Sequence, residues 1–174
     1  MNKALERLAT EMGLDAPENE RTRLAFGYAC ALRVKHLLEE PAVSECLLAL
    51  GLFLDGSVDR PHLAGAAERA SELATRHQGS KSIDGCGHAA VSASYAVAKA
   101  LAGKALEAAD YAAYAMVYGQ GGYGAVADRE SFEPEFQWQV SCLASLAGRA
   151  ATRAPTSQCR NESQKPPRPP GHPV

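Results

Sequence analysis

The sequence contains no apolar run long enough to cross a membrane, and no apolar segment follows a basic stretch near its start. A membrane-spanning helix needs roughly 20 predominantly apolar residues, and a secretory signal has the second pattern. β-branched residues are also few, and the apolar–polar alternation typical of strands is missing. From these absences we expect an all-α protein of the cytoplasm, with no membrane contact.

Patterns that bind metals or build disulfide frameworks are missing as well. The cysteines are odd in number and lie far apart, at Cys30, Cys46, Cys86, Cys142 and Cys159. Without a secretory signal, this favours reduced thiols, several of them in the core. No C-x-x-C, no H-E-x-x-H and no paired E-x-x-H pattern occurs. We therefore predict no bound metal and no cofactor.

The chain has little excess of positive charge outside its C-terminal end. Five basic residues and one acid lie from Arg149 onward, while the chain of 174 residues carries a net charge of -2. The part before Arg149 is therefore acidic, whereas phosphate binding depends on clustered Lys and Arg. We expect no nucleic-acid partner. A basic protein partner fits this charge better, although surface acids can also serve solubility alone.

What the sequence does contain is helical spacing: apolar and small residues recur at steps of three and four. The clearest case is the alanine-rich stretch 84–119, which predicts two helices joined at Ala102, Gly103 and Lys104. Similar spacing, with glycines or prolines at helix ends, predicts further helices within 3–12, 20–40, 41–56, 59–79 and 132–147. We predict a single helical bundle of six or seven helices, forming one domain over residues 1–150.

From residue 151 the composition changes. Six of the ten prolines lie there, with almost no large apolar side chain. Such a segment cannot bury enough surface to offset the entropy cost of ordering it, so we predict that residues 151–174 form a disordered, proline-rich and basic tail. The run Pro-Pro-Arg-Pro-Pro within it favours a polyproline conformation, which can dock on an aromatic groove.

Residues 119–124 match the G-x-G-x-x-G pattern of dinucleotide-binding loops letter by letter. That function requires a strand before the glycines and a helix after them. Here a predicted helix comes before them, so we interpret the segment as the end of that helix followed by a flexible turn.

One short segment combines a thiol with an imidazole: Asp84, Cys86 and His88 alternate with glycines at the start of an alanine-rich helix. A helix N-terminus stabilises a thiolate, and an imidazole can act as a base. However, residues i and i+2 of a helix do not face each other. We expect a small buried cysteine and a hydrogen-bonded histidine at this corner rather than catalysis, and we predict that the protein is not an enzyme.

The most suggestive feature is a set of tyrosines: Tyr111, Tyr114, Tyr118 and Tyr123. The first three are separated by three and four residues and therefore share a helix face. Tyrosine is enriched in protein interfaces, but a central helix can also bury such residues in the core. Nearby acids would give an interface a negative rim: Asp128, Glu130 and Glu133, with Asp110 and Glu135.

The central stretch resembles a known family. The segments GHAAVSASYAVAKALAG and EAADYAAYAM, preceded by ACALRVKHLL and HLAGAAERASEL, resemble the Imm-5-like immunity proteins of bacterial polymorphic toxin systems over roughly residues 23–147. The resemblance implies an all-α cytoplasmic protein that binds and neutralises a cognate toxin, and it brings no catalytic residues. Immunity proteins often oppose basic toxins through complementary charge.

Two other functions stay open at this point. A helical scaffold or regulator would bind a peptide, or a second copy of itself as a homodimer, through the tyrosines. A small thiol-dependent enzyme would use Cys86 and His88 in a cleft between helices. The first predicts a concentration-dependent oligomer, and the second predicts a thiol with a perturbed pKa in a pocket.

Overall fold

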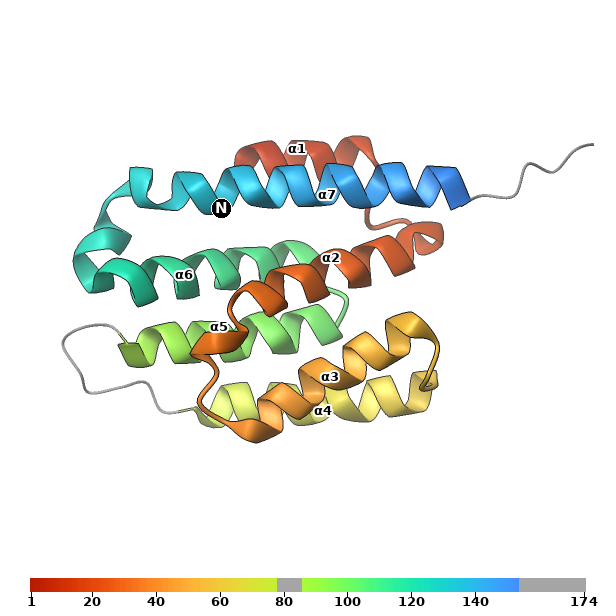
Figure 1. Cartoon of the computed structure of the whole chain (residues 1–174), viewed down its shortest axis with the longest axis horizontal. Coiled ribbons are helices and arrows are strands. Elements are labelled where there is room, and N and C mark those ends of the chain that lie inside the picture. Colours follow the sequence, from red (N-terminus) through yellow and green to blue (C-terminus); the bar gives the residue numbers. More distant parts are fainter. Residues whose placement is uncertain (78–85, 154–174) are drawn as a thin grey trace, which may run out of the picture.

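The computed structural model describes residues 1–77 and 86–153 of the chain. Within these ranges the chain forms seven α-helices and three short 3-10 helices, with no β-strand (Figure 1). The α-helices are α1 (Lys3–Glu11), α2 (Glu20–Arg33), α3 (Pro41–Asp55), α4 (Arg60–Arg76), α5 (Cys86–Leu101), α6 (Ala105–Ala127) and α7 (Glu133–Arg153). The 3-10 helices are η1 (Pro17–Asn19), η2 (Lys35–Leu37) and η3 (Arg129–Phe132). The prediction of an all-α bundle with six or seven helices is confirmed.

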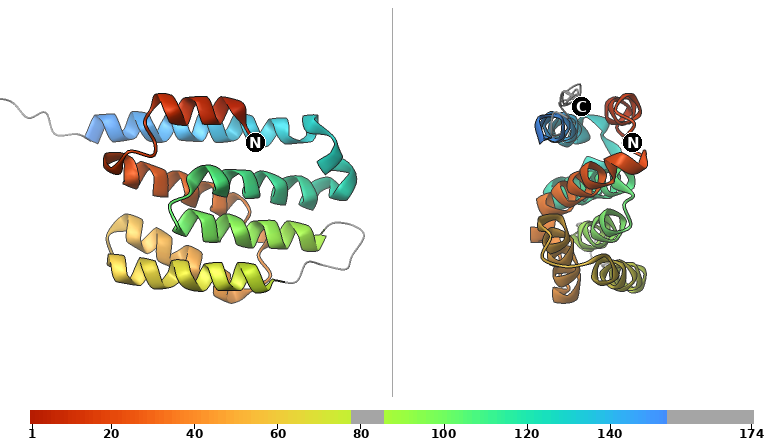
Figure 2. Two further views of the ribbon diagram at one scale, coloured as in Figure 1. Left: turned by 180° about the vertical axis from the view of Figure 1, so that it is seen from behind. Right: turned by 90° about the vertical axis from the view of Figure 1, so that its right-hand side faces the viewer.

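The helices run along one long axis and stack in tiers (Figures 1 and 2). The pair α1 and α7 forms one end of the stack, the pair α3 and α4 forms the other, and α2, α5 and α6 lie between them. Among the described helices, none is both long and apolar enough to span a bilayer.

Several helix ends follow from single residues. The Asn2 side chain accepts a hydrogen bond from the amide of Leu5 and caps α1, and Asp59 caps α4 through the amide of His62. Pro41 occupies the first turn of α3, where its missing N–H costs no hydrogen bond. Gly56 ends α3 with a φ of 90°, as predicted from the sequence.

The core has two main parts. One lies between α3, α4 and the neighbouring faces of α2 and α5, and its large side chains include Val43, Leu47, Leu50, Leu63 and Val97. The other lies between α1, α2, α5, α6 and α7, and its large side chains include Leu5, Leu14, Phe26, Val34 and Leu143. The apolar faces of α3, α4 and α7 therefore point into the core.

The hairpin of α5 and α6 lies at the centre of the stack and is packed mainly with alanine. Gly103, at a φ of 71°, forms the predicted turn between the two helices. Small residues allow close approach: a Cβ added to Gly27 of α2 would lie 3.1 Å from the Cα of Ala100. Buried alanines of the hairpin include Ala89, Ala90, Ala93, Ala96, Ala105, Ala108, Ala109, Ala112, Ala113 and Ala115.

The helix predicted to run from Glu20 to about Glu40 is shorter than expected. It ends at Arg33, where Val34 leaves the helical conformation with a ψ of 7°, and η2 follows. Val34 is fully buried and Leu37 packs against the second part of the core. The helix therefore ends where Val34 and Leu37 pack into the core. The spacing of apolar residues in the sequence does not reveal such packing.

The predicted flexible turn after Gly119 is wrong. The helix α6 continues through the glycines to Ala127, and only Gly122 has non-helical angles, with φ 61° and ψ -151°. Gly119 stays helical and packs closely, because a Cβ there would lie 3.2 Å from Leu37. Gly119 therefore allows close packing and Gly122 makes one local break in the helix, and the segment is not a loop.

Two sequence predictions concern residues outside the described ranges. Residues 154–174, most of the predicted tail, are among them, and α7 continues to Arg153, three residues past the predicted domain boundary. Asp84 also lies outside these ranges. The helix α4, predicted to reach Gly79, ends at Arg76 with His77 as its C-cap.

Candidate functional site

The start of α5 and the end of α6 lie at the same end of the molecule (Figure 1). Six aromatic side chains from α5, α6, η3 and α7 form a continuous series of ring contacts in this region. Successive ring centroids lie 5.2 Å apart for His88–Tyr123, 5.7 Å for Tyr123–Tyr118, 6.4 Å for Tyr118–Tyr114, 5.1 Å for Tyr114–Phe132 and 5.6 Å for Phe132–Phe136. We call these six residues the aromatic face. Tyr114 and Tyr123 are 41% and 44% exposed, whereas Phe132 is 8% exposed. The face is thus an accessible surface with a buried floor.

The break at Gly122 brings Tyr123 into this series. Tyr114 and Tyr118 are four residues apart on α6 and are neighbours on any regular helix. Tyr118 and Tyr123 are five residues apart and would point in different directions on a continuous helix. Because Gly122 leaves the helical conformation, the Tyr123 ring meets the Tyr118 ring edge to face. A residue that the sequence suggested as part of a flexible turn therefore shapes the surface.

His88 joins the tyrosines rather than forming a separate reactive corner. Its Nδ1 and the Tyr123 hydroxyl are joined by a hydrogen bond of 2.9 Å, and its ring lies 5.5 Å from that of Tyr118. The sequence analysis considered His88 only with Asp84 and Cys86. Cys86 is the first residue of α5, and Asp84 lies outside the described residues. The expected hydrogen-bonded histidine is confirmed, with a partner 35 residues away.

Tyr111 is separated from the other tyrosines by its partner on α5. Its ring stacks on Tyr95 at 5.0 Å with an interplanar angle of 19°, and it packs against the core. This contact belongs to a seam of three α5–α6 pairs: Lys99–Glu107, Tyr95–Tyr111 and His88–Tyr118. From the first pair to the second, the residue number falls by four on α5 and rises by four on α6. From the second pair to the third, it falls by seven on α5 and rises by seven on α6. Tyr111 is therefore a packing residue of the hairpin, and the exposed tyrosines begin at Tyr114.

Three acids next to the aromatic face are exposed, and we call Asp128, Glu130 and Glu133 the acidic border. Asp128 caps η3 by accepting a hydrogen bond from the Glu130 amide, at 3.0 Å. Glu133 accepts one from the Gln137 side chain, also at 3.0 Å. Within the described residues, none of the three carboxylates forms a salt bridge. The border therefore presents exposed carboxylates that form no salt bridge, although Arg129 lies between Asp128 and Glu130 in the sequence.

The other two acids that were expected at this rim are engaged elsewhere. Glu135 is buried and pairs with Arg33 at 2.7 Å, and the Arg33 guanidinium lies 4.4 Å from the centroid of the Trp138 ring. Asp110 is half-buried, 3.8 Å from the amino group of Met1. Burial raises the pKa of Asp110, despite the attraction of this amino group. Glu135 links α2 to α7, and neither acid contributes to a partner surface.

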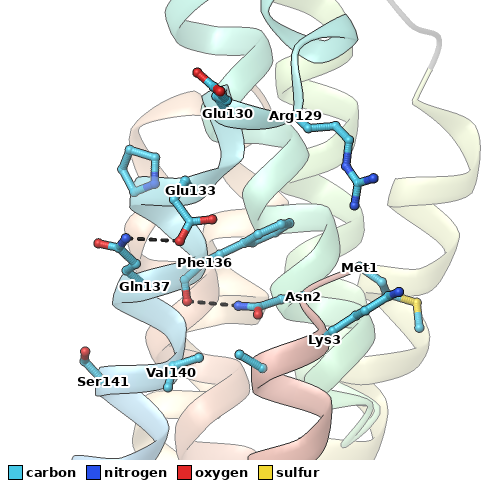
Figure 3. A pocket seen from close by; sticks show the side chains of 12 residues that line it. Met1, Asn2, Lys3, Arg129, Glu130, Glu133, Phe136, Gln137, Val140 and Ser141 are labelled. Carbon is cyan, nitrogen blue, oxygen red and sulfur yellow. Dashed lines mark hydrogen bonds between the residues drawn. The ribbon is translucent and has the colours of Figure 1, made fainter.

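A groove of about 1170 Å³ lies between the starts of α1 and α7, beside the acidic border (Figure 3). Glu130 and Glu133 lie on one side of it, and Lys3 and Arg129 lie on the other. Phe136 contributes to its apolar wall and also belongs to the aromatic face. The groove and the face therefore adjoin at Phe136.

The described thiols are poorly suited to nucleophilic chemistry. Cys30 and Cys46 are buried, as predicted, and Cys142 is half-buried. Burial raises the pKa of all three thiols, most strongly that of Cys30. The thiolate is the reactive form, so each of these cysteines stays protonated near neutral pH. Within the described residues, no group of three or more His, Cys, Asp or Glu side chains has the arrangement of a metal site.

In comparisons with protein-family models, curated proteins and solved structures, no match to this chain was found. The features of the molecule that bear on its function are therefore the aromatic face, its acidic border and the groove.

Proposed function

We propose that the protein is an immunity-type binding protein, which holds a cognate basic toxin on the aromatic face and thereby neutralises it in the cytoplasm. The observation that supports this most is the exposure of Tyr114 and Tyr123 above a floor formed by Phe132. Exposed aromatic rings that are held in place by neighbouring rings lose little entropy on binding, and such residues dominate many interfaces.

The acidic border supports a basic partner. Asp128, Glu130 and Glu133 are exposed and form no salt bridge among the described residues, so their carboxylates are open to an incoming Lys or Arg. Complementary charge of this kind mainly speeds association and rejects partners of the wrong charge. The tyrosines would then supply most of the affinity, and the acids most of the selectivity.

The raised pKa of the thiols of Cys30, Cys46 and Cys142 supports a role in packing for these three residues. Self-association through the aromatic face is the second candidate, because two accessible tyrosines can also contact a second copy. Analytical ultracentrifugation over a range of concentrations separates the two: a homodimer forms without any partner.

The test of the proposal begins with capture of bound proteins from the native cell lysate and their identification by mass. The captured protein is then purified and titrated by calorimetry with the intact chain and its variants. Tyr114→Ala should weaken binding at least about tenfold, since truncating an interface anchor costs roughly 2 kcal/mol. Co-expression with the toxin should show the matching loss of protection.

The matched control for this test is Leu48→Ala, which truncates another exposed apolar side chain, 59% exposed on α3 at the other end of the stack. It should leave the affinity unchanged. Equal binding by Tyr114→Ala and the unmodified chain would contradict the assignment of the face, and capture of only further copies of the chain would favour self-association.

A further inference from the structure

The aromatic face has polar groups without partners. Among the described residues, no hydrogen bond involves the hydroxyl of Tyr114 or Tyr118, while that of Tyr123 is bonded to His88. The carboxylates of Glu130 and Glu133 form no salt bridge in the same ranges. A ligand suited to this surface therefore has carbonyl groups that can accept hydrogen bonds, apolar rings that pack on tyrosine, and a positive charge.

The sequence of this chain contains a segment with these three properties. Residues 165–170, Lys-Pro-Pro-Arg-Pro-Pro, combine four prolines with two cations. A polyproline helix has no internal hydrogen bonds, so its carbonyls are free to accept from tyrosine hydroxyls, and its proline rings pack on aromatic side chains. Lys165 and Arg168 carry the charge that the acidic border lacks.

The segment can reach the face from the end of α7. The helix spans Glu133–Arg153 and is about 30 Å long at 1.5 Å per residue. Residues 154–164 can cover about 34 Å at the polyproline rise of 3.1 Å per residue. Lys165 can therefore return to the level of Glu133, at the start of α7, where the acidic border and the groove lie.

We propose that residues 165–170 dock on the aromatic face of their own chain, with the prolines against Tyr114 and Tyr118 and the cations at Glu130 and Glu133. Because both parts belong to one chain, the effective concentration of the segment at the face is about millimolar, and a weak contact suffices. The contact covers the surface that a partner would use. It does not depend on a toxin, so its test stands apart from the test of the proposed function.

The first experiment joins the two parts covalently. A carbodiimide reagent forms an amide between an amine and a carboxylate that touch, and mass spectrometry of the digested monomer locates it. We expect a bond between Lys165 and the acidic border, with far fewer bonds to remote exposed acids such as Glu18 or Glu45. Lys165→Arg keeps the charge but cannot form the amide, and should abolish the product. Bonds spread evenly over all acids would overturn the proposal.

Mixing copies labelled with ¹⁵N and unlabelled copies shows which chain supplies the segment. Products within single copies support the proposal, and products that join the two kinds of copy overturn it in favour of docking on a second copy.

The second experiment measures the contact without a reagent. In the full chain, replacing Pro166, Pro167, Pro169 and Pro170 by Ala should shift the amide signals of Tyr114, Tyr118 and Phe132 in ¹H–¹⁵N spectra. The matched control replaces Thr156, Ser157, Gln158 and Ser163 by Ala and should leave these signals in place. Identical spectra of the face in the unmodified chain and the proline variant would overturn the proposal.

The two proposals can fail separately. Suppose that Tyr114→Ala loses toxin binding but the Pro→Ala substitutions do not change the crosslinking. The proposed toxin interface would then stand, and the proposed docking of residues 165–170 would be rejected. If the segment covers the face, the proline variant should also bind the partner at least about threefold more tightly, because the competing contact is gone.

Discussion

The two parts of α6 differ in their surroundings although both are rich in small residues. Residues 105–117 are mostly buried, and the buried positions include Ala105, Ala108, Ala109, Ala112, Ala113, Ala115 and Val117. From Gly119 to Ala127 no residue is buried. In the first part, small side chains let neighbouring helices approach on most sides. In the second part, small side chains leave the ring of Tyr123 exposed, where it joins the aromatic face.

This contrast shows that alanine and glycine have two uses in one helix. Between α2, α5 and α7, each buried alanine contributes little apolar area, but the close helix contacts allow many of them to be buried together. Beyond Gly119 the same small side chains leave the Tyr123 ring exposed beside that of Tyr118. The following three predictions test this division, from the largest expected effect to the smallest.

Replacing a buried alanine by leucine should damage only the first part of α6. Ala112 is fully buried in the second part of the core, so Ala112→Leu should lower the free energy of unfolding by about 3 kcal/mol through overpacking. Ala127→Leu makes the same change at an exposed position and should alter it by less than about 0.5 kcal/mol. Urea denaturation measures both, and similar losses in the two variants would remove the distinction.

Replacing Gly122 by alanine should test whether the break in α6 positions Tyr123 in the aromatic face. Its angles, φ 61° and ψ -151°, are essentially restricted to glycine, so Gly122→Ala should cost about 2 kcal/mol of unfolding free energy. It should also move Tyr123 away from His88. Gly124→Ala is the control: it is helical with no atom within 4 Å of an added Cβ, and should gain up to about 1 kcal/mol.

A gain of stability in both glycine variants would show that the break is not required by the fold. Thermal unfolding and the ring-current shift of the His88 signals report the two effects independently.

The smallest expected effect concerns the first pair of the seam. The hydrogen bond from Lys99 is the largest influence on the pKa of Glu107 and lowers it; burial opposes this, and attraction by Lys99 and Lys104 lowers the pKa further. A lowered pKa in the folded protein adds stability above the unfolded value of about 4.3, and this is lost as the pH falls through the lower folded value. Glu107→Gln should therefore cost less than about 1 kcal/mol near pH 7, because the pair is largely exposed.

The cost of Glu107→Gln should shrink as the pH falls below the unfolded value and disappear once the pH is below the lowered folded pKa, where the unmodified carboxyl is protonated as well. Glu68→Gln, at an exposed acid on α4 that forms no salt bridge within the described residues, should show no such pH dependence. A cost that stays constant with pH would mean that the seam is held by packing alone.

Much of the fold could be predicted because its determinants are local. The cap at Asp59, the proline at position 41 and the glycines at 56 and 103 mark helix ends through their own backbone preferences. The end of α2 at Arg33 could not be predicted, because Val34 and Leu37 are directed by the core, and nothing in the spacing of 20–40 reports that packing.

The candidate site was predicted in part. The sequence pointed to the tyrosines and the acids, yet it grouped Tyr111 with Tyr114 and placed Glu135 and Asp110 at the rim. Tyr111 instead stacks on Tyr95 within the hairpin, and Glu135 instead pairs with Arg33. One overlooked signal was available: the spacing from Lys99 through Tyr95 to His88 is mirrored from Glu107 through Tyr111 to Tyr118. This symmetry predicts the antiparallel register of the hairpin, and with it the meeting of His88 and Tyr118.

The sequence by itself determined the helical class, the alanine-rich hairpin and most helix ends, since periodicity, propensity and capping act over a few neighbouring residues. Only the tertiary structure decided that His88 meets Tyr123, that Gly122 is the single break among the described glycines of α6, and that three acids rather than five border the aromatic face. Those outcomes depend on the register and packing of helices far apart in the chain, where each contact is fixed by the volumes and charges of residues that no local pattern brings together.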